Sequence, residues 1–347
     1  MQQGSQKTVI RWAIGVLIVV ATVAALIAVV KLDPTGRTGS GLSKDFLYDL
    51  NELARIDPNL ILYAASSPPM KTGFSRSRGI ALDGAGRIYV AGDRGIRVFS
   101  EAGELEQVVN VSGEPQCLTV SDDGTIYVGL RDRVEVLGPQ GQHIALWEAL
   151  GDEAFLTSIE RYEDTIFVAD AGHRIVLCYD TAGTLLDHIG EKDPDRNIPG
   201  FMVPSPHFDL AVSRDGMLRV VSPGRHRIET YTLDGDFEFW WGEPSTSVEG
   251  FCGCCNPINF AILSNGWFIT SEKGLERVKV YDSDGAFVGV VAGVAQLTQG
   301  KLVKICDTPE ECQEGGMDVA AGADGRVYVL ETTENTVRVF SRKDTKQ

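Results

Sequence analysis

One pattern recurs six times along this chain, and it constrains the fold more than any other feature of the sequence. Each copy has an apolar strand, a tight turn, a second apolar strand, and a polar loop leading to a third strand, as in GIALDGAGRIYVAGDRGIRVFSEAG from Gly79. The turns align at Gly86, Gly124, Asp164, Gly216, Gly266 and Gly325. Five glycines and one aspartate at one position indicate a hairpin whose backbone needs a positive φ.

The repeat predicts an all-β fold, a six-bladed β-propeller. Copies of roughly 40 to 50 residues with about four strands each are typical of propeller blades. The last copy stops after its third strand, so its blade lacks a strand. We expect NLILYAAS, from Asn59 to Ser66, to complete that blade, because an open seam would expose an unpaired strand edge.

The copies resemble NHL repeats, whose consensus passes through an Asp-Gly turn, an apolar strand and an Asn-His-Arg-Ile-like loop. The best matches are ADAGHRIVLCYD from Ala169 to Asp180 and SPGRHRIETY from Ser222 to Tyr231. The resemblance covers about residues 79–342 and implies an NHL-like six-bladed propeller. It implies no reaction, because such propellers serve as binding scaffolds, receptors and enzymes alike. The GCCNP motif at residues 253–257 is similar to that of membrane-anchored bacterial NHL-type propellers. This resemblance names no ligand.

The N-terminal region predicts a membrane anchor. Residues 12–30 form a run of 19 residues without a charge. A helix of that length rises roughly 28 Å, close to the thickness of bilayer hydrocarbon. We therefore expect a single-pass membrane protein with its N-terminus in the cytoplasm and its propeller outside the cytoplasm, which means the periplasm in a Gram-negative cell. The expected segments are a short N-terminus (1–11), the transmembrane anchor (12–30), a linker in which a short helix can form (31–58), the propeller (59–342) and a tail (343–347).

The overall charge bears on the partners. The formal net charge is −16 and the pI is about 4.8. Nucleic-acid backbones are held by clustered Lys and Arg, so this balance argues against a nucleic-acid partner. We expect a protein or small ligand at the loop-bearing face of the propeller, and the membrane at the N-terminal helix.

Three connections between blades are enlarged, at residues 191–207, 243–258 and 294–316. In a propeller, all such connections cross the same face beside the central axis, and enlarged loops on a rigid scaffold commonly carry function. These loops and the strand starts next to them contain Cys117, His207, Cys252, Cys254, Cys255, Cys306 and Cys312. The remaining cysteine, Cys178, is expected to be a buried and inert strand residue.

Several interpretations of this cysteine-rich face remain open. An exported domain permits disulfides, which would make the protein an interaction scaffold with purely structural cross-links. Thiolates with His207 could instead bind a soft metal such as copper or zinc, although the CxCC spacing matches no strong zinc signature. The adjacent pair Cys254–Cys255 could also form a strained, labile and hence redox-active disulfide.

An enzyme is the alternative from another class. The resemblance includes propeller lyases and hydrolases that use histidines and a metal around the axis. Here such a site would need His207 together with Asp209 or Asp318, and a single histidine is few for a metal centre of that kind. The sequence contains no nucleophile elbow, phosphate-binding glycine loop or HExxH motif. We therefore predict noncatalytic binding or redox work at the cysteine-lined face.

Overall fold

The computed structural model describes residues 12–25, 27, 50–298 and 316–343. The chain divides into two compact units, residues 1–50 and 51–347. In the first unit, residues 12–25 form a helix, and residue 27 is also helical. The described strands all lie in the second unit; α2 (Leu50–Leu53) spans the boundary between the units, and the 3-10 helix η2 (Pro58–Leu60) follows it.

The predicted membrane anchor is wrong. Within the described ranges, no helix is both long enough and apolar enough to cross a membrane. The uncharged run suggested a 19-residue span, but the continuous described helix covers only residues 12–25. At about 1.5 Å per residue such a helix rises roughly 21 Å, short of the roughly 30 Å that a bilayer core requires. The extracytoplasmic location that rested on this anchor is withdrawn with it.

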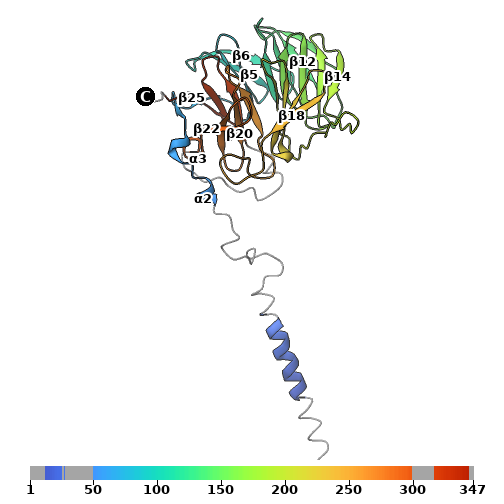
Figure 1. The fold of residues 1–347 in the computed structure, drawn as a ribbon, viewed down its shortest axis with the longest axis vertical. Helices are drawn as coiled ribbons and strands as arrows, with labels where there is room; N and C mark the ends of the chain where they lie inside the picture. Colours follow the sequence, from blue (N-terminus) through green and yellow to red (C-terminus); the bar gives the residue numbers. More distant parts are fainter. Residues whose placement is uncertain (1–11, 26, 28–49, 299–315, 344–347) are drawn as a thin grey trace, which may run out of the picture. The chain divides into compact units, whose positions relative to one another are not determined.

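The second unit is the predicted six-bladed β-propeller (Figure 1). Each blade is an antiparallel meander of neighbouring strands. Blades 1 to 3 contain β3 (Ser77–Leu82), β4 (Ile88–Gly92), β5 (Gly95–Phe99) and β6 (Leu105–Asn110); β7 (Cys117–Val120), β8 (Ile126–Gly129), β9 (Val134–Leu137) and β10 (His143–Leu146); and β11 (Leu156–Tyr162), β12 (Thr165–Asp170), β13 (Ile175–Asp180) and β14 (Leu185–Ile189). Blades 4 and 5 contain β15 (Leu210–Val212), β16 (Leu218–Ser222), β17 (Arg227–Tyr231) and β18 (Phe237–Trp241); and β19 (Asn259–Ile262), β20 (Phe268–Glu272), β21 (Arg277–Tyr281) and β22 (Phe287–Ala292). Blade 6 contains β23 (Met317–Ala321), β24 (Val327–Glu331), β25 (Thr336–Arg342), β1 (Tyr63–Ala65) and β2 (Met70–Lys71), and short helices η3 (Pro223–Arg225) and α3 (Val294–Leu297) lie in connections.

The ring closes as the sequence predicts. The first strand of each blade contacts the first strand of the next, and β23 contacts β3. The outer edge of blade 6 is completed by β1, which pairs antiparallel with β25 through Tyr63↔Arg342 and Ala65↔Phe340. The strand at the start of the propeller thus covers the edge that the incomplete last repeat leaves.

The hairpin glycines have the backbone conformation that their alignment predicts, with one difference. Gly86, Gly124, Gly216, Gly266 and Gly325 all have φ between 73° and 83°. In blade 3 the residue with positive φ is Glu163 (φ 52°), not Asp164. Tyr162 pairs directly with Thr165, so this blade has a two-residue turn, and the alignment at that turn is shifted by one residue.

The core lies between the blades. Six apolar clusters fill the six interfaces of neighbouring blades; one, for example, joins Ile269 and Val280 of blade 5 to Val319 and Val329 of blade 6. Blade strands are therefore apolar on both faces, which explains the nearly continuous apolar runs of the repeat. The packed interfaces hold the strand ends, and hence the loops between blades, in fixed positions around the axis.

Candidate functional site

The axis of the propeller is surrounded by one residue from the start of each first strand. Backbone hydrogen bonding to the second strands makes these positions equivalent, with Asp209 directly before the first paired residue of β15: Gly79, Cys117, Ser158, Asp209, Asn259 and Asp318. Asp209 accepts a hydrogen bond from Phe260 N of the next blade (2.7 Å), and Asp318 accepts one from Ile80 N (2.8 Å). The carboxylates named in the enzyme alternative therefore bind backbone N–H groups and hold neighbouring blades together.

This structural role predicts an effect on stability. Asp318 accepts hydrogen bonds from Ile80 N and Val319 N, both at the seam between the last and first blades. Asp318→Ala removes both acceptors and should lower the free energy of unfolding by about 1–3 kcal/mol. Urea unfolding near pH 6 measures it, and Asp318→Asn, which keeps one carbonyl acceptor, should lose less. Equal stability of both variants and the wild type would contradict this role.

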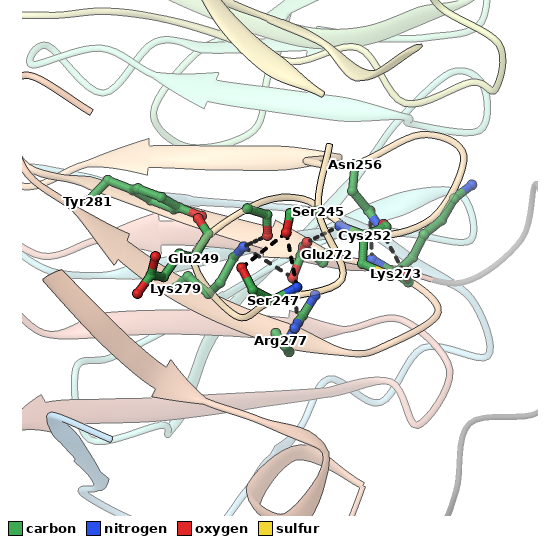
Figure 2. A network of polar contacts seen from close by, with 11 residues as sticks. Ser245, Ser247, Glu249, Cys252, Asn256, Glu272, Lys273, Arg277, Lys279 and Tyr281 are labelled. Atoms are coloured by element: carbon green, nitrogen blue, oxygen red, sulfur yellow. Dashed lines mark hydrogen bonds and ion pairs between the residues drawn. The ribbon is translucent and has the colours of Figure 1, made fainter. Parts of the chain in front are cut away.

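The second enlarged connection, residues 243–258, carries Cys252, Cys254 and Cys255 and is fixed to blade 5. Asn256 clamps its far end, since Nδ2 donates to the carbonyl oxygen of Lys273 (2.9 Å) and Oδ1 accepts from the N–H of Lys273 (2.9 Å). Cys252 N donates to Glu272 Oε1 (3.0 Å) at the end of β20. Figure 2 shows these contacts around the loop. The backbone on both sides of Cys254 and Cys255 is therefore held in place.

Beneath this loop lies a buried charge network formed by Glu272, Arg277 and Lys279 (Figure 2). All three side chains are at most 1% exposed, and both basic groups contact Glu272 Oε2, at 2.7 Å and 3.4 Å. Lys279 Nζ also donates to Gly250 O (2.6 Å). Burial lowers the pKa of Lys279 to about 8, and Glu272 opposes that shift. One carboxylate thus compensates two buried cations and ties them to the loop.

The loop presents two adjacent thiols. Cys254 is exposed, Cys255 is buried, and their Sγ atoms are 3.4 Å apart in a thiol–thiol hydrogen bond. Burial and the hydrogen bond with Cys255 raise the pKa of Cys254, while the charge of Lys273 lowers it. The pair therefore combines an accessible sulfur with a sheltered one in direct contact.

Among the described residues, the other predicted ligands do not gather with this pair around one point. Within the described part of the chain, no group of three or more His, Cys, Asp or Glu side chains is placed to hold one metal ion. Cys117 is buried at the first position of β7, where burial strongly raises the pKa of its thiol. Cys178 is buried in β13, as predicted, and burial raises its pKa to about 12. Cys306 and Cys312 lie outside the described residues.

His207 precedes β15 on the same face. Its Nε2 is buried without a hydrogen-bond partner among the described groups. Burial lowers the pKa of His207 to about 3, and the charges of Lys273 and Arg78 act in the same direction. The imidazole is therefore neutral at physiological pH. Lys273, whose charge acts on both His207 and Cys254, was not identified from the sequence, where it looks like an ordinary turn lysine.

A central cavity of about 650 Å³ runs along the axis between the first strands of the six blades. Its lining includes Cys117, Asp209 and Asp318 at one end, and the exposed hairpin residues Asp122 and Glu163 at the other. The hairpins lie at the strand ends opposite the enlarged connections. The cavity therefore reaches the face of the propeller that does not carry the cysteines.

No protein-family model and no curated protein matches this sequence. Solved structures show the same fold at low identity. A gluconolactonase from Xanthomonas campestris aligns over 81% of this chain and 97% of its own, with 17% identity and a TM-score of 0.54. Virginiamycin B lyase from Staphylococcus aureus aligns over 82% and 90%, with 14% identity and a TM-score of 0.51. A protein of unknown function from Bacteroides thetaiotaomicron aligns over 81% and 72%, with 14% identity and a TM-score of 0.56.

These similarities establish a six-bladed propeller that shares its architecture with lyase and lactonase propellers. At such identities they show the fold alone, and a fold of this kind supports many activities. Membership of the NHL family stays a resemblance carried by the repeat motifs. Function has to be argued from the residues on the two faces of the ring.

Proposed function

We propose that this propeller is a binding module that carries out thiol–disulfide exchange with a bound partner through Cys254 and Cys255. The observation that carries the proposal is the 3.4 Å contact between the two sulfurs, with one thiol exposed and the other buried. An accessible attacking thiol next to a resolving thiol is the arrangement that exchange requires. Burial and the hydrogen bond with Cys255 raise the pKa of Cys254, and the nearby charge of Lys273 partly offsets this by favouring the thiolate.

The exchange balances with a disulfide of the partner as oxidant. The Cys254 thiolate attacks one sulfur of that disulfide, its S–S bond breaks, and the other sulfur leaves as a thiolate and takes up a proton. Cys255 then loses its proton and attacks Cys254, which releases the second partner sulfur. The partner disulfide ends as two thiols and the cysteine pair as one disulfide, so two electrons move and both protons end on the partner.

The same steps run in reverse, and backbone geometry favours that direction. Adjacent Cα atoms across a trans peptide are about 3.8 Å apart, below the usual range for disulfide-bonded residues. Such a disulfide stores strain and is readily reduced. The oxidised pair therefore tends to pass its disulfide to a partner dithiol.

The test is oxidation of the full chain in buffers that contain reduced and oxidised glutathione at graded ratios, followed by alkylation and intact-mass measurement. The wild type should lose two alkylatable thiols together, and peptide mapping should place the bond between Cys254 and Cys255. Cys254→Ser should abolish this transition, whereas Cys178→Ser should leave it unchanged. A pair that stays fully alkylated at every ratio would sink the proposal. Bonds of Cys254 and Cys255 only to other cysteines would sink it as well and would favour the scaffold with structural disulfides.

Elemental analysis of the same samples tests the copper or zinc prediction. Soft metals prefer thiolate ligands, and the contacting sulfurs of Cys254 and Cys255 are fewer than the four ligands that a structural zinc site uses. Near-stoichiometric copper or zinc that disappears in Cys254→Ser would replace exchange with metal binding as the function of this loop. The expected result is metal-free protein with an intact redox transition.

A further inference from the structure

The central cavity is lined by many more acidic side chains than basic ones. Its lining contains one basic side chain, Arg161, and six carboxyl groups: Asp122, Asp123, Glu160, Glu163, Asp209 and Asp318. Arg161 is engaged at the hairpin end, where it donates to Glu163 O and lies 3.8 Å from Asp123. The other carboxyl groups have no basic side chain beside them in the cavity lining, so the cavity attracts cations when these groups are ionised.

Glu160 is the exception within its ring of equivalent residues. Glu160 lies two residues after Ser158, which belongs to the ring of equivalent positions that includes Asp209 and Asp318. Strand pairing aligns Glu160 with the residues two positions after that ring in the other blades: Ala81, Thr119, Ala211, Ala261 and Ala320. Five small residues leave the space that forms the cavity, and the sixth places a carboxylate in it.

The Glu160 carboxylate has no hydrogen bond or ion pair to any group in the described residues. It is partly buried and lines the cavity. Asp209 and Asp318 differ, because their oxygens accept hydrogen bonds from backbone N–H groups. A carboxyl group without a protein partner that lines a cavity is a candidate for binding a ligand there.

The carboxyl groups are spread along the axis. At about 3.3 Å per strand residue, Glu160 lies roughly 6–7 Å from the ring that contains Asp209, and roughly 10 Å from the hairpin end. No three of the described acidic groups gather around a point that could hold one metal ion. The spacing therefore suits several positive charges carried on one extended chain better than a compact ion.

We infer that the axial cavity is a binding site for an elongated aliphatic polyamine, which enters from the hairpin face and places an ammonium group against Glu160. Methylene segments then lie against the small residues of the cavity wall, and the outer ammonium groups lie near Asp122 and Glu163. This site is on the opposite face from Cys254 and Cys255 and does not depend on their chemistry.

Calorimetric titration of the full chain with spermidine, at low ionic strength and near pH 8, tests the inference. The wild type should bind with one-to-one stoichiometry, and Glu160→Gln should weaken the affinity about tenfold or more. Glu104→Gln, which removes an exposed carboxylate outside the cavity lining and so makes the same change of charge, should stay within about twofold of the wild type.

Four results would overturn the inference. One is the absence of spermidine binding to the wild type, and another is equal affinity of the wild type and Glu160→Gln. The third is tighter binding of Mg²⁺ or Ca²⁺ than of spermidine, with displacement of the polyamine, which would make the cavity a site for a compact cation. Butylamine binding as tightly as spermidine would likewise contradict an extended ligand.

Discussion

Glu272→Gln is expected to lower the free energy of unfolding by about 3–5 kcal/mol, because it leaves Arg277 and Lys279 as buried cations without a countercharge. Both groups lie within 3.4 Å of one Glu272 oxygen and are at most 1% exposed. Removing one partner of a buried ion pair costs far more than the pair itself contributes. Urea unfolding at neutral pH, with tryptophan fluorescence as the signal, measures the change.

The matched control is Asp236→Asn, which breaks the exposed ion pair with Arg196. Both side chains are about half exposed, so solvent screens the pair and its loss should change stability by less than about 1 kcal/mol. Glu272→Gln should also speed alkylation of the buried Cys255, since the network holds the cysteine loop through Gly250 O and Cys252 N. A variant as stable as the control would show that the cations find other compensation.

The propeller itself could be predicted from the sequence because its information is local and repeated. In each copy, apolar runs indicate the strands, and in most copies a glycine such as Gly86 or Gly124 indicates the hairpin. The closing strand at Tyr63 could be predicted because the last repeat is one strand short. The apolar N-terminal run misled, because the absence of charge permits a membrane helix but does not require one.

The candidate sites were less accessible to sequence reasoning. The enlarged loop with Cys254 and Cys255 could be located, but the contact between their sulfurs depends on how Asn256 and Glu272 hold the backbone. In the sequence, Arg277 and Lys279 alternate with apolar residues, which indicates exposed side chains on one face of a strand. They are buried in the structure because the loop packs over them. Glu160 is different: an alignment of the axis-facing positions already sets it apart from the alanines around it, so this signal was present and missed.

Glu160→Gln is expected to stabilise the protein by about 2–4 kcal/mol near pH 8 and by almost nothing near pH 4. Burial and the charge of Asp209 raise the pKa of Glu160 from 4.5 to about 8. Between those values the folded state holds a proton that the unfolded state has released. Stability of the wild type must therefore fall as pH rises through that window, and glutamine removes this dependence at one position.

Chemical unfolding of both proteins from pH 4 to pH 9 measures the difference directly. Burial also raises the pKa of Asp209 to about 6 and of Asp318 to about 7, so the wild type and the variant share part of the pH dependence. The difference between the two curves isolates Glu160, and Glu163→Gln at the exposed hairpin end should leave the curve within about 0.5 kcal/mol of the wild type. A difference that does not grow with pH would mean that Glu160 is solvated or paired, and would remove the unpartnered charge on which the polyamine site rests. A growing difference would show that the fold tolerates a destabilising carboxylate at its axis, which is the expected cost of a binding group.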